Sequence, residues 1–165
     1  MQKMDFVQQL HAWIAGEASQ GRFMMVAGTL LSIAAFLILR SENALLRGML
    51  VPLALLVAMN LGYGYVLVSR PTTSLKVEAA YRQNQTQAVE RELNKARKDE
   101  QYYKSARPVW ALLTAVSVLL FFVFSGNYYR GLSMGLTAMF LGALLIDSFL
   151  HNRLLVYIDA LQHLV

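Results

Sequence analysis

Residues 48–69 read GMLVPLALLVAMNLGYGYVLVS, a run of 22 positions without one charged side chain. A helix needs roughly 20 apolar residues to cross the hydrocarbon core of a membrane. Apolar side chains surround this segment on every side, so it has no polar face that would suit the surface of a soluble protein. The stretch therefore predicts a transmembrane helix.

Three further segments lack charged residues in the same way, namely 23–39, 108–129 and 131–146, and the last stays apolar past Asp147 to Leu150. Four such segments predict an all-α polytopic membrane protein with four transmembrane helices. We expect all 165 residues to form one membrane domain. The predicted spans are about 23–39, 48–69, 108–129 and 131–150.

The overall composition fits a membrane protein and excludes several functional classes. Hydrophobic residues make up 56% of the chain and charged residues 15%, with a mean hydropathy of +0.42. Soluble domains are roughly 45–50% apolar and about 25% charged. The chain has no cysteine, which excludes disulfides, iron–sulfur clusters, thiolate metal sites and a cysteine nucleophile. We expect no cofactor and no metal.

The net charge of +5 is distributed as membrane topology would require. Of the 15 Lys and Arg residues, nine lie in segment 70–107 and three more precede the first span or follow the last. The two short loops hold only Arg40, Arg47 and Arg130. Lys and Arg are concentrated on the cytoplasmic side of membrane proteins. This distribution predicts that both termini and segment 71–107 are cytoplasmic, and it removes the reason to expect nucleic-acid binding.

Residues 1–20 carry the apolar periodicity of a helix. Apolar side chains recur there every three or four positions, which predicts an amphipathic helix that lies in the membrane interface or packs under the bundle. We expect Gly21 to let the chain turn from this helix into the first span. The apolar stripe consists of Met4, Val7, Leu10 and Ile14.

Segment 71–107 is predicted to be a cytoplasmic helical segment. Pro71 ends the second span, and residues 75–106 contain neither glycine nor proline. One long helix and two helices broken near Asn84–Thr86 fit the sequence equally well. The segment is either a solvated hairpin or stalk, or a surface for a partner or for self-association. Its apolar stripe, too thin for an independent core, consists of Val77, Tyr81, Ala88, Val89, Leu93, Ala96 and Tyr103.

The two halves of the chain share a pattern of arginines. Arg47-Gly48 opens the second span and Arg130-Gly131 opens the fourth, and a further arginine follows each after 23 residues, as Arg70 and Arg153. An internal duplication would give this pattern, with its halves related by an axis along the membrane normal. Arginines that simply mark both ends of each span would give it as well.

Small residues recur at helical spacing in the first and fourth spans, and they allow helices to approach closely within one bundle or between copies. They are Gly28, Ser32 and Ala35, then Gly131, Gly135, Ala138 and Gly142.

Asp147 is the one acidic residue inside a predicted span. Ionisable residues within a membrane are costly, and they are functional candidates by default. Asp147 lies about one turn from the cytoplasmic boundary, where structural pairing with a cation and the handling of protons or ions are both plausible. The possible partners are His151, Arg70, Arg107 and Arg153.

Asn60 lies near the middle of the second span, where it would either line a pore or form hydrogen bonds between helices. For the interhelical bonds the candidate partners are Thr114, Ser117, Ser133 and Thr137. The complete set of candidate residues for interaction or ion handling is Asp147, His151, Arg153, Arg70, Asn60, Arg47 and Arg130.

Patterns typical of catalysis are absent from the sequence. It contains no phosphate-binding loop, no HExxH, no GxSxG and no recognisable nucleophile–base pair. Asp147 with His151, and Asp159 with His163, each place a carboxylate and an imidazole on one helix face, but the two pairs lie about 18 Å apart along a helix and cannot share a metal ion. We therefore expect no enzymatic activity, with an acid–base role for Asp147 and His151 as a distant alternative.

Several short motifs lie between residues 47 and 160, namely Arg47-Gly48-x3-Pro52-Leu53, Gly62-x2-Tyr65, Arg70-Pro71, Glu78, Arg82, Tyr103 to Arg107, and Leu144-Leu145-Ile146-Asp147. Together these motifs resemble a class of small, mostly uncharacterised four-span bacterial inner-membrane proteins. Some proteins of this class resemble immunity partners of pore-forming toxins. The resemblance implies a multi-pass protein of the bacterial inner (plasma) membrane that inhibits by direct contact.

Two functions follow as expectations. The first is a non-enzymatic membrane interaction protein, such as an immunity, regulatory or assembly subunit, that acts through its helix faces and segment 71–107. The second is a homo-oligomeric channel or small transporter, because four helices of this size enclose little volume alone. The expected partners are the lipid bilayer and either another protein or further copies of the same chain.

Overall fold

The computed structural model describes residues 6–164, with the side chain of Thr73 left out, and every regular element in this range is an α-helix. The prediction of an all-α chain is confirmed. The helices are α1 (Phe6–Leu39), α2 (Ala44–Ser69), α3 (Pro71–Gln83), α4 (Gln85–Val123) and α5 (Asn127–Gln162).

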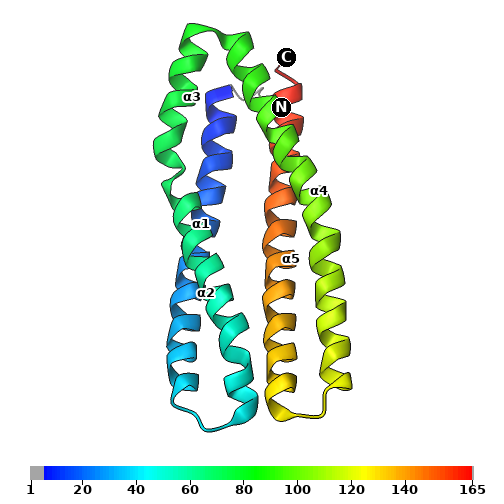
Figure 1. Ribbon diagram of the computed structural model, residues 1–165. Helices are drawn as coiled ribbons and strands as arrows, with labels where there is room; N and C mark the ends of the chain where they lie inside the picture. The colour runs from blue at the N-terminus through cyan, green and yellow to red at the C-terminus, as the bar shows by residue number, and fades with distance from the viewer. Residues whose placement is uncertain (1–5, 165) are drawn as a thin grey trace.

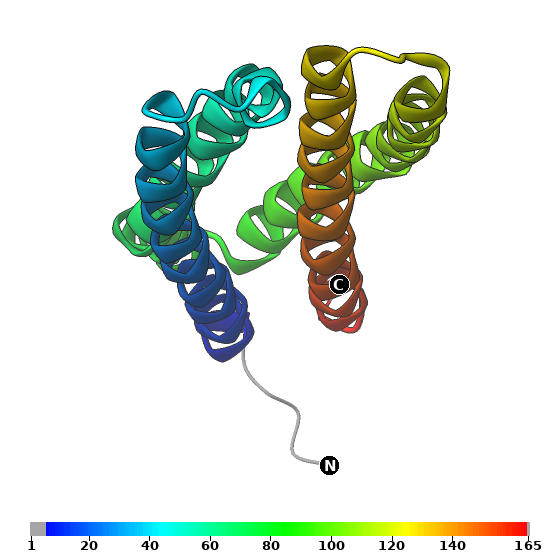
Figure 2. The same cartoon turned by 90° about the horizontal axis from the view of Figure 1, so that it is seen from below.

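Four long helical segments are each long and apolar enough to cross a membrane, as the charge-free stretches predict. They run side by side as an elongated bundle (Figure 1). α2 and α5 pack against each other at the centre, α1 packs mainly on α2, and α4 packs mainly on α5. Seen along the bundle, α1 and α4 lie apart on the two flanks (Figure 2). The described ends of the chain and the α3–α4 turn lie at one end of the bundle, and the two short loops lie at the other (Figure 1).

α1 differs from the prediction of an interfacial helix joined to a separate span. The helix is continuous from Phe6 to Leu39, so the turn expected at Gly21 is wrong. A Cβ at Gly21 would come within 2.7 Å of the Gly64 carbonyl oxygen on α2. The glycine therefore allows two helices to touch rather than the chain to bend. Residues 1–5, including Met4 of the predicted stripe, lie outside the described residues.

Segment 71–107 is broken at Asn84, which confirms the alternative of two helices. Asn84 has an extended backbone, and its side-chain oxygen accepts a hydrogen bond from the Gln87 backbone N–H at 3.1 Å, which caps α4. α4 then continues without interruption through Pro108 into the third predicted span. That helix ends at Val123 and α5 starts at Asn127, so the predicted boundary at 129 is too late.

The best-packed core lies outside the predicted spans. Residues 6–20, 71–106 and 151–162 pack together as a helical unit that we call the cap. The apolar stripe of segment 71–107 packs against side chains from α1 and α5 in the cap. The three segments therefore share one core. The buried core residues of the cap include Phe6, Leu10, Trp13, Ile14, Val89, Leu93, Ala96, Tyr103, Leu154, Tyr157, Ile158 and Leu161.

Glycines bring α2 and α5 together at their N-terminal ends. A Cβ at Gly48 would meet the Tyr128 carbonyl oxygen, and one at Gly131 would meet the Leu45 carbonyl oxygen. Further along, Gly135 lies against Pro52. These small residues therefore pack helices within one chain.

The loop between α1 and α2 and the loop between α4 and α5 are each closed by an arginine that donates to a backbone carbonyl oxygen. Arg47 Nε donates to the Ser41 carbonyl oxygen at 2.8 Å, and Arg130 Nε donates to the Phe124 carbonyl oxygen at 2.9 Å. Each bond reaches back six residues. Both arginines thus stabilise loops, and the repeated pattern in the sequence corresponds to a repeated local structure.

Candidate functional site

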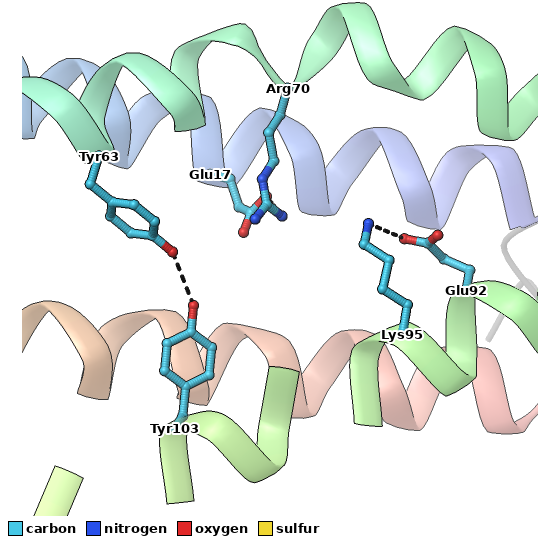
Figure 3. Close-up of polar contacts among 6 residues, drawn as sticks. All are labelled: Glu17, Tyr63, Arg70, Glu92, Lys95 and Tyr103. Carbon is cyan, nitrogen blue, oxygen red and sulfur yellow. Dashed lines mark hydrogen bonds and ion pairs between the residues drawn. The ribbon is translucent and has the colours of Figure 1, made fainter. Parts of the chain in front are cut away.

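Glu17 and Arg70 form a shielded ion pair where the cap meets the spans. Arg70 Nη1 donates to Glu17 Oε2 at 2.7 Å, and Glu17 is buried (Figure 3). The guanidinium carbon also lies 5.3 Å from the centre of the Trp13 ring, which stacks on Tyr157. Arg70 ends α2 immediately before Pro71, so the pair joins the α2–α3 junction to α1.

Burial dominates the electrostatics of this pair. It raises the pKa of Glu17 from 4.5 to about 7, although Arg70, Lys95 and Arg153 all favour the carboxylate. Desolvation disfavours a charged carboxylate more strongly than these cations stabilise it. Glu17 can therefore hold or release a proton near neutral pH.

His151, one of the predicted candidates, is buried between α4 and α5. Arg107 Nη1 donates to His151 Nδ1 at 2.8 Å, so the imidazole accepts at that atom. Burial, together with the charge of Arg107, lowers the pKa of His151. His151 Nε2 is buried and has no hydrogen-bond partner within residues 6–164. The imidazole is therefore neutral at physiological pH.

Asp147 does not pair with any of the cations that the sequence suggested. Its Oδ2 accepts a hydrogen bond from Trp110 Nε1 at 2.8 Å. Within the described part of the chain, no Lys, Arg or His nitrogen lies within ion-pair distance of it. Of the two alternatives for Asp147, an ion pair is not formed among residues 6–164, where Arg107 donates to His151 and Arg70 to Glu17.

Asp147 lines a cleft of about 450 Å³, which we call the Asp147 cleft. The hydroxyl oxygens of Tyr63 and Tyr103 lie 3.3 Å apart in its wall and point toward each other (Figure 3). The lining residues are Met24, Met59, Gly62, Tyr63, Val66, Tyr102, Tyr103, Trp110, Ala143, Ile146 and Asp147.

A second cleft of about 560 Å³ lies between α1, α2 and α5, and we call it the Arg153 cleft. Arg153 packs along Gly16, 3.1 Å from the position of a Cβ there. Its Nη1 atom and Gln20 Oε1 are both buried without a hydrogen-bond partner within residues 6–164. The lining residues are Ser19, Gln20, Phe23, Met24, Leu56, Asn60, Gly142, Leu145, Ile146, Phe149 and Arg153.

Asn60 lines the Arg153 cleft, and within the part of the chain that the structure describes it makes no interhelical hydrogen bond. Its Nδ2 donates to the Leu56 carbonyl oxygen of its own helix at 2.9 Å. The hydroxyls expected to meet it also donate to carbonyl oxygens of their own helices. They belong to Thr114, Ser117, Ser133 and Thr137.

Glu17, Gln20 and Trp110 are the polar residues that sequence analysis missed. Glu17 follows Leu10, Trp13 and Ile14 at spacings of seven, four and three, which places it on the apolar face of α1. That spacing could have identified it as buried. The pairing of Trp110 with Asp147 depends on how α4 and α5 align, and no local signal reveals it.

Among the described residues, no group of three His, Asp or Glu side chains could hold a metal ion. The arrangement instead offers two clefts with polar groups in their walls. Comparisons with protein-family models, curated proteins and solved structures found no match.

Proposed function

We propose that this chain is a non-enzymatic membrane protein that acts by direct contact, with the Arg153 cleft as its contact surface. The observation that carries the proposal is that Gln20 and Arg153 place half-buried polar side chains in the wall of a cleft whose other side chains are mostly apolar. A polar side chain in an apolar cleft is costly when it has no hydrogen-bond partner. A partner helix with complementary polar groups would form hydrogen bonds with the accessible parts of these two side chains.

The apolar part of the same cleft suits a docked helix. Phe23, Leu145 and Phe149 line the cleft and are exposed, and Gly142 leaves room between them. Helices in membranes associate by close packing around small residues and by interhelical hydrogen bonds. The cleft offers both.

The location that we propose is the bacterial inner membrane, with both termini and the cap in the cytoplasm. The exposed basic side chains of segment 71–107 favour this orientation, since Lys and Arg are retained on the cytoplasmic side. Within the resemblance to immunity proteins, the partner would be a pore-forming toxin. Those basic residues include Lys76, Arg82, Arg91, Lys95, Arg97, Lys98 and Lys104.

Site-specific photo-crosslinking in the membranes of the native host tests the contact. A photoreactive amino acid replaces Phe149, which is 65% exposed in the cleft, or Leu119, which is 64% exposed on α4 and lines neither cleft. We expect a protein adduct of discrete mass from position 149 and none from position 119. Arg153→Ala should abolish the adduct. Adducts with lipid alone at position 149 would refute the proposal.

A homo-oligomeric channel or small transporter is the second candidate, and the observation that favours it is Asp147 in a cleft without an ion-pair partner among residues 6–164. Native mass spectrometry should then find several copies of the chain in one complex. Conductance in proteoliposomes should change on Asp147→Asn and Asn60→Leu. Unchanged conductance in both variants would exclude a pore role for these residues.

A further inference from the structure

We infer that the Asp147 cleft binds a lipophilic organic cation. A carboxylate in the wall of an apolar cleft calls for a positive charge, and the described residues supply none within ion-pair distance. Arg107 keeps its charge and acts on Asp147 from α4, but it donates to His151 and lies beyond ion-pair distance of Asp147, which therefore has no direct counter-ion among residues 6–164. The cleft is thus complementary in charge to a cation that arrives from outside.

The rest of the wall suits a cation of organic rather than inorganic type. Tyr63, Tyr102, Tyr103 and Trp110 line the cleft around Asp147. Aromatic rings attract organic cations through their quadrupole, and clusters of them recognise quaternary ammonium groups. A divalent metal ion would require about six or more oxygen ligands, whereas this wall offers a single carboxylate.

The size and position of the cleft favour an amphiphilic ligand. Its volume of about 450 Å³ falls within the roughly 300–1,000 Å³ typical of small-molecule sites. A neighbouring groove shares Met59, Trp110 and Ala143 with it and continues the apolar surface along α2 and α5. The charged end of a ligand would lie at Asp147 and its apolar part against this groove.

Binding of tetraphenylphosphonium to the full chain in lipid nanodiscs tests the inference, measured by equilibrium dialysis. We expect saturable binding that weakens about tenfold or more, equivalent to at least 1.4 kcal/mol, in Asp147→Asn. Asp159→Asn, an exposed carboxylate on the same helix, should leave the affinity unchanged. Tetraphenylborate, an anion of similar shape, should show no binding that depends on Asp147.

A second variant, at an exposed aromatic residue, tests the inference independently if Asp147→Asn fails to fold. Tyr102 lines the cleft with an exposed side chain, so Tyr102→Leu should fold and weaken binding by about threefold. Tyr128→Leu, an exposed ring outside the cleft, is its control. Equal affinity in Tyr102→Leu and Tyr128→Leu, or equal binding of the cation and the anion, would overturn the inference. Crosslinking at Phe149 reports separately on the contact function.

Discussion

Glu17 illustrates how a single buried carboxylate can carry a pH response. Its ion pair with Arg70 holds α1 to the α2–α3 junction, but the pair is shielded from water. Moving two charged groups out of water costs free energy, and the attraction between the two charges offsets only part of that cost. The folded protein therefore favours the protonated form of Glu17, whose pKa is about 7 instead of 4.5.

The stability of the fold should consequently decrease as the pH rises through this range. Between pH 4.5 and 7 the folded state holds a proton on Glu17 that the unfolded state has released, so folding is favoured at the lower pH. Over this whole pH range the free energy of unfolding should decrease by about 3 kcal/mol because of Glu17. The melting temperature of wild type in detergent should fall relative to that of Glu17→Gln between about pH 5 and 8.

The comparison with Glu17→Gln is needed because His151 titrates in the opposite sense. Its pKa is lowered from 6.5 in the fold, so acid below that value destabilises the protein through His151 in both variants. The difference between the two melting curves isolates Glu17. A difference that stays constant over the whole pH range would contradict the assignment.

At the scale of single residues, the sequence identified several candidate residues but not the partners that they contact. Asp147 stands out as a lone acid inside an apolar run, and Arg70 and His151 stand at span boundaries. Their partners did not follow, because Arg107, Arg70 and Trp110 are brought to their contacts by the way distant helices align. Local spacing cannot reveal a contact between residues 53 positions apart, as in the Glu17–Arg70 pair.

The helices were largely predictable as elements, since a charge-free run of sufficient length has few alternatives. The main error, a turn at Gly21, came from treating a glycine as a point of flexibility. In α1 the glycine instead permits the contact with Gly64. A helix in lipid retains its backbone hydrogen bonds across such a residue, because no water replaces them.

The glycine contact between α2 and α5 gives a prediction at the scale of elements. Gly131→Ala should destabilise the protein strongly, because the new Cβ would meet the Leu45 backbone, which cannot move as a flexible side chain would. Overpacking of this kind costs about 1–3 kcal/mol or more. Gly62→Ala is the matched control, since a Cβ there would meet nothing within 4 Å. Thermal unfolding in detergent measures both, and equal melting temperatures would disprove the close approach.

The cap provides a second prediction at this scale. Leu10 is 1% exposed in the core of the cap, whereas Leu75 on α3 is 66% exposed. Leu10→Ala should reduce stability by about 2–5 kcal/mol, while Leu75→Ala should change it little. Hydrogen exchange should show faster opening of residues 85–103 in Leu10→Ala. Unaltered exchange there would mean that α1 does not stabilise the cap.

Considered as a whole, the molecule concentrates its tightly packed side chains in the cap and leaves clefts where its helices would meet lipid. In the proposed orientation, water would drive the burial of apolar groups in the cap, whereas the spans would gain little from covering their side chains because lipid tails are as apolar as leucine. The cap thus holds together helices whose membrane faces stay free for contacts. The sequence offered packing under the bundle as one alternative for residues 1–20, but it did not reveal which residues of α4 and α5 complete that core, because the core is shared among three separate segments.

The orientation of the molecule gives the last prediction. The α3–α4 turn lies at one end of the bundle and the loop after α1 lies at the other (Figure 1). Because the chain has no cysteine, single cysteines introduced at Gln85 and at Ser41 can be labelled without background. In intact bacterial cells a membrane-impermeant maleimide should label position 41 and not position 85, and in inverted membrane vesicles it should label position 85 and not position 41. The positive-inside distribution requires this outcome. Labelling of position 85 in intact cells would reverse the topology, and it would place the basic surface of segment 71–107 outside the cytoplasm, where a cytoplasmic partner could not reach it.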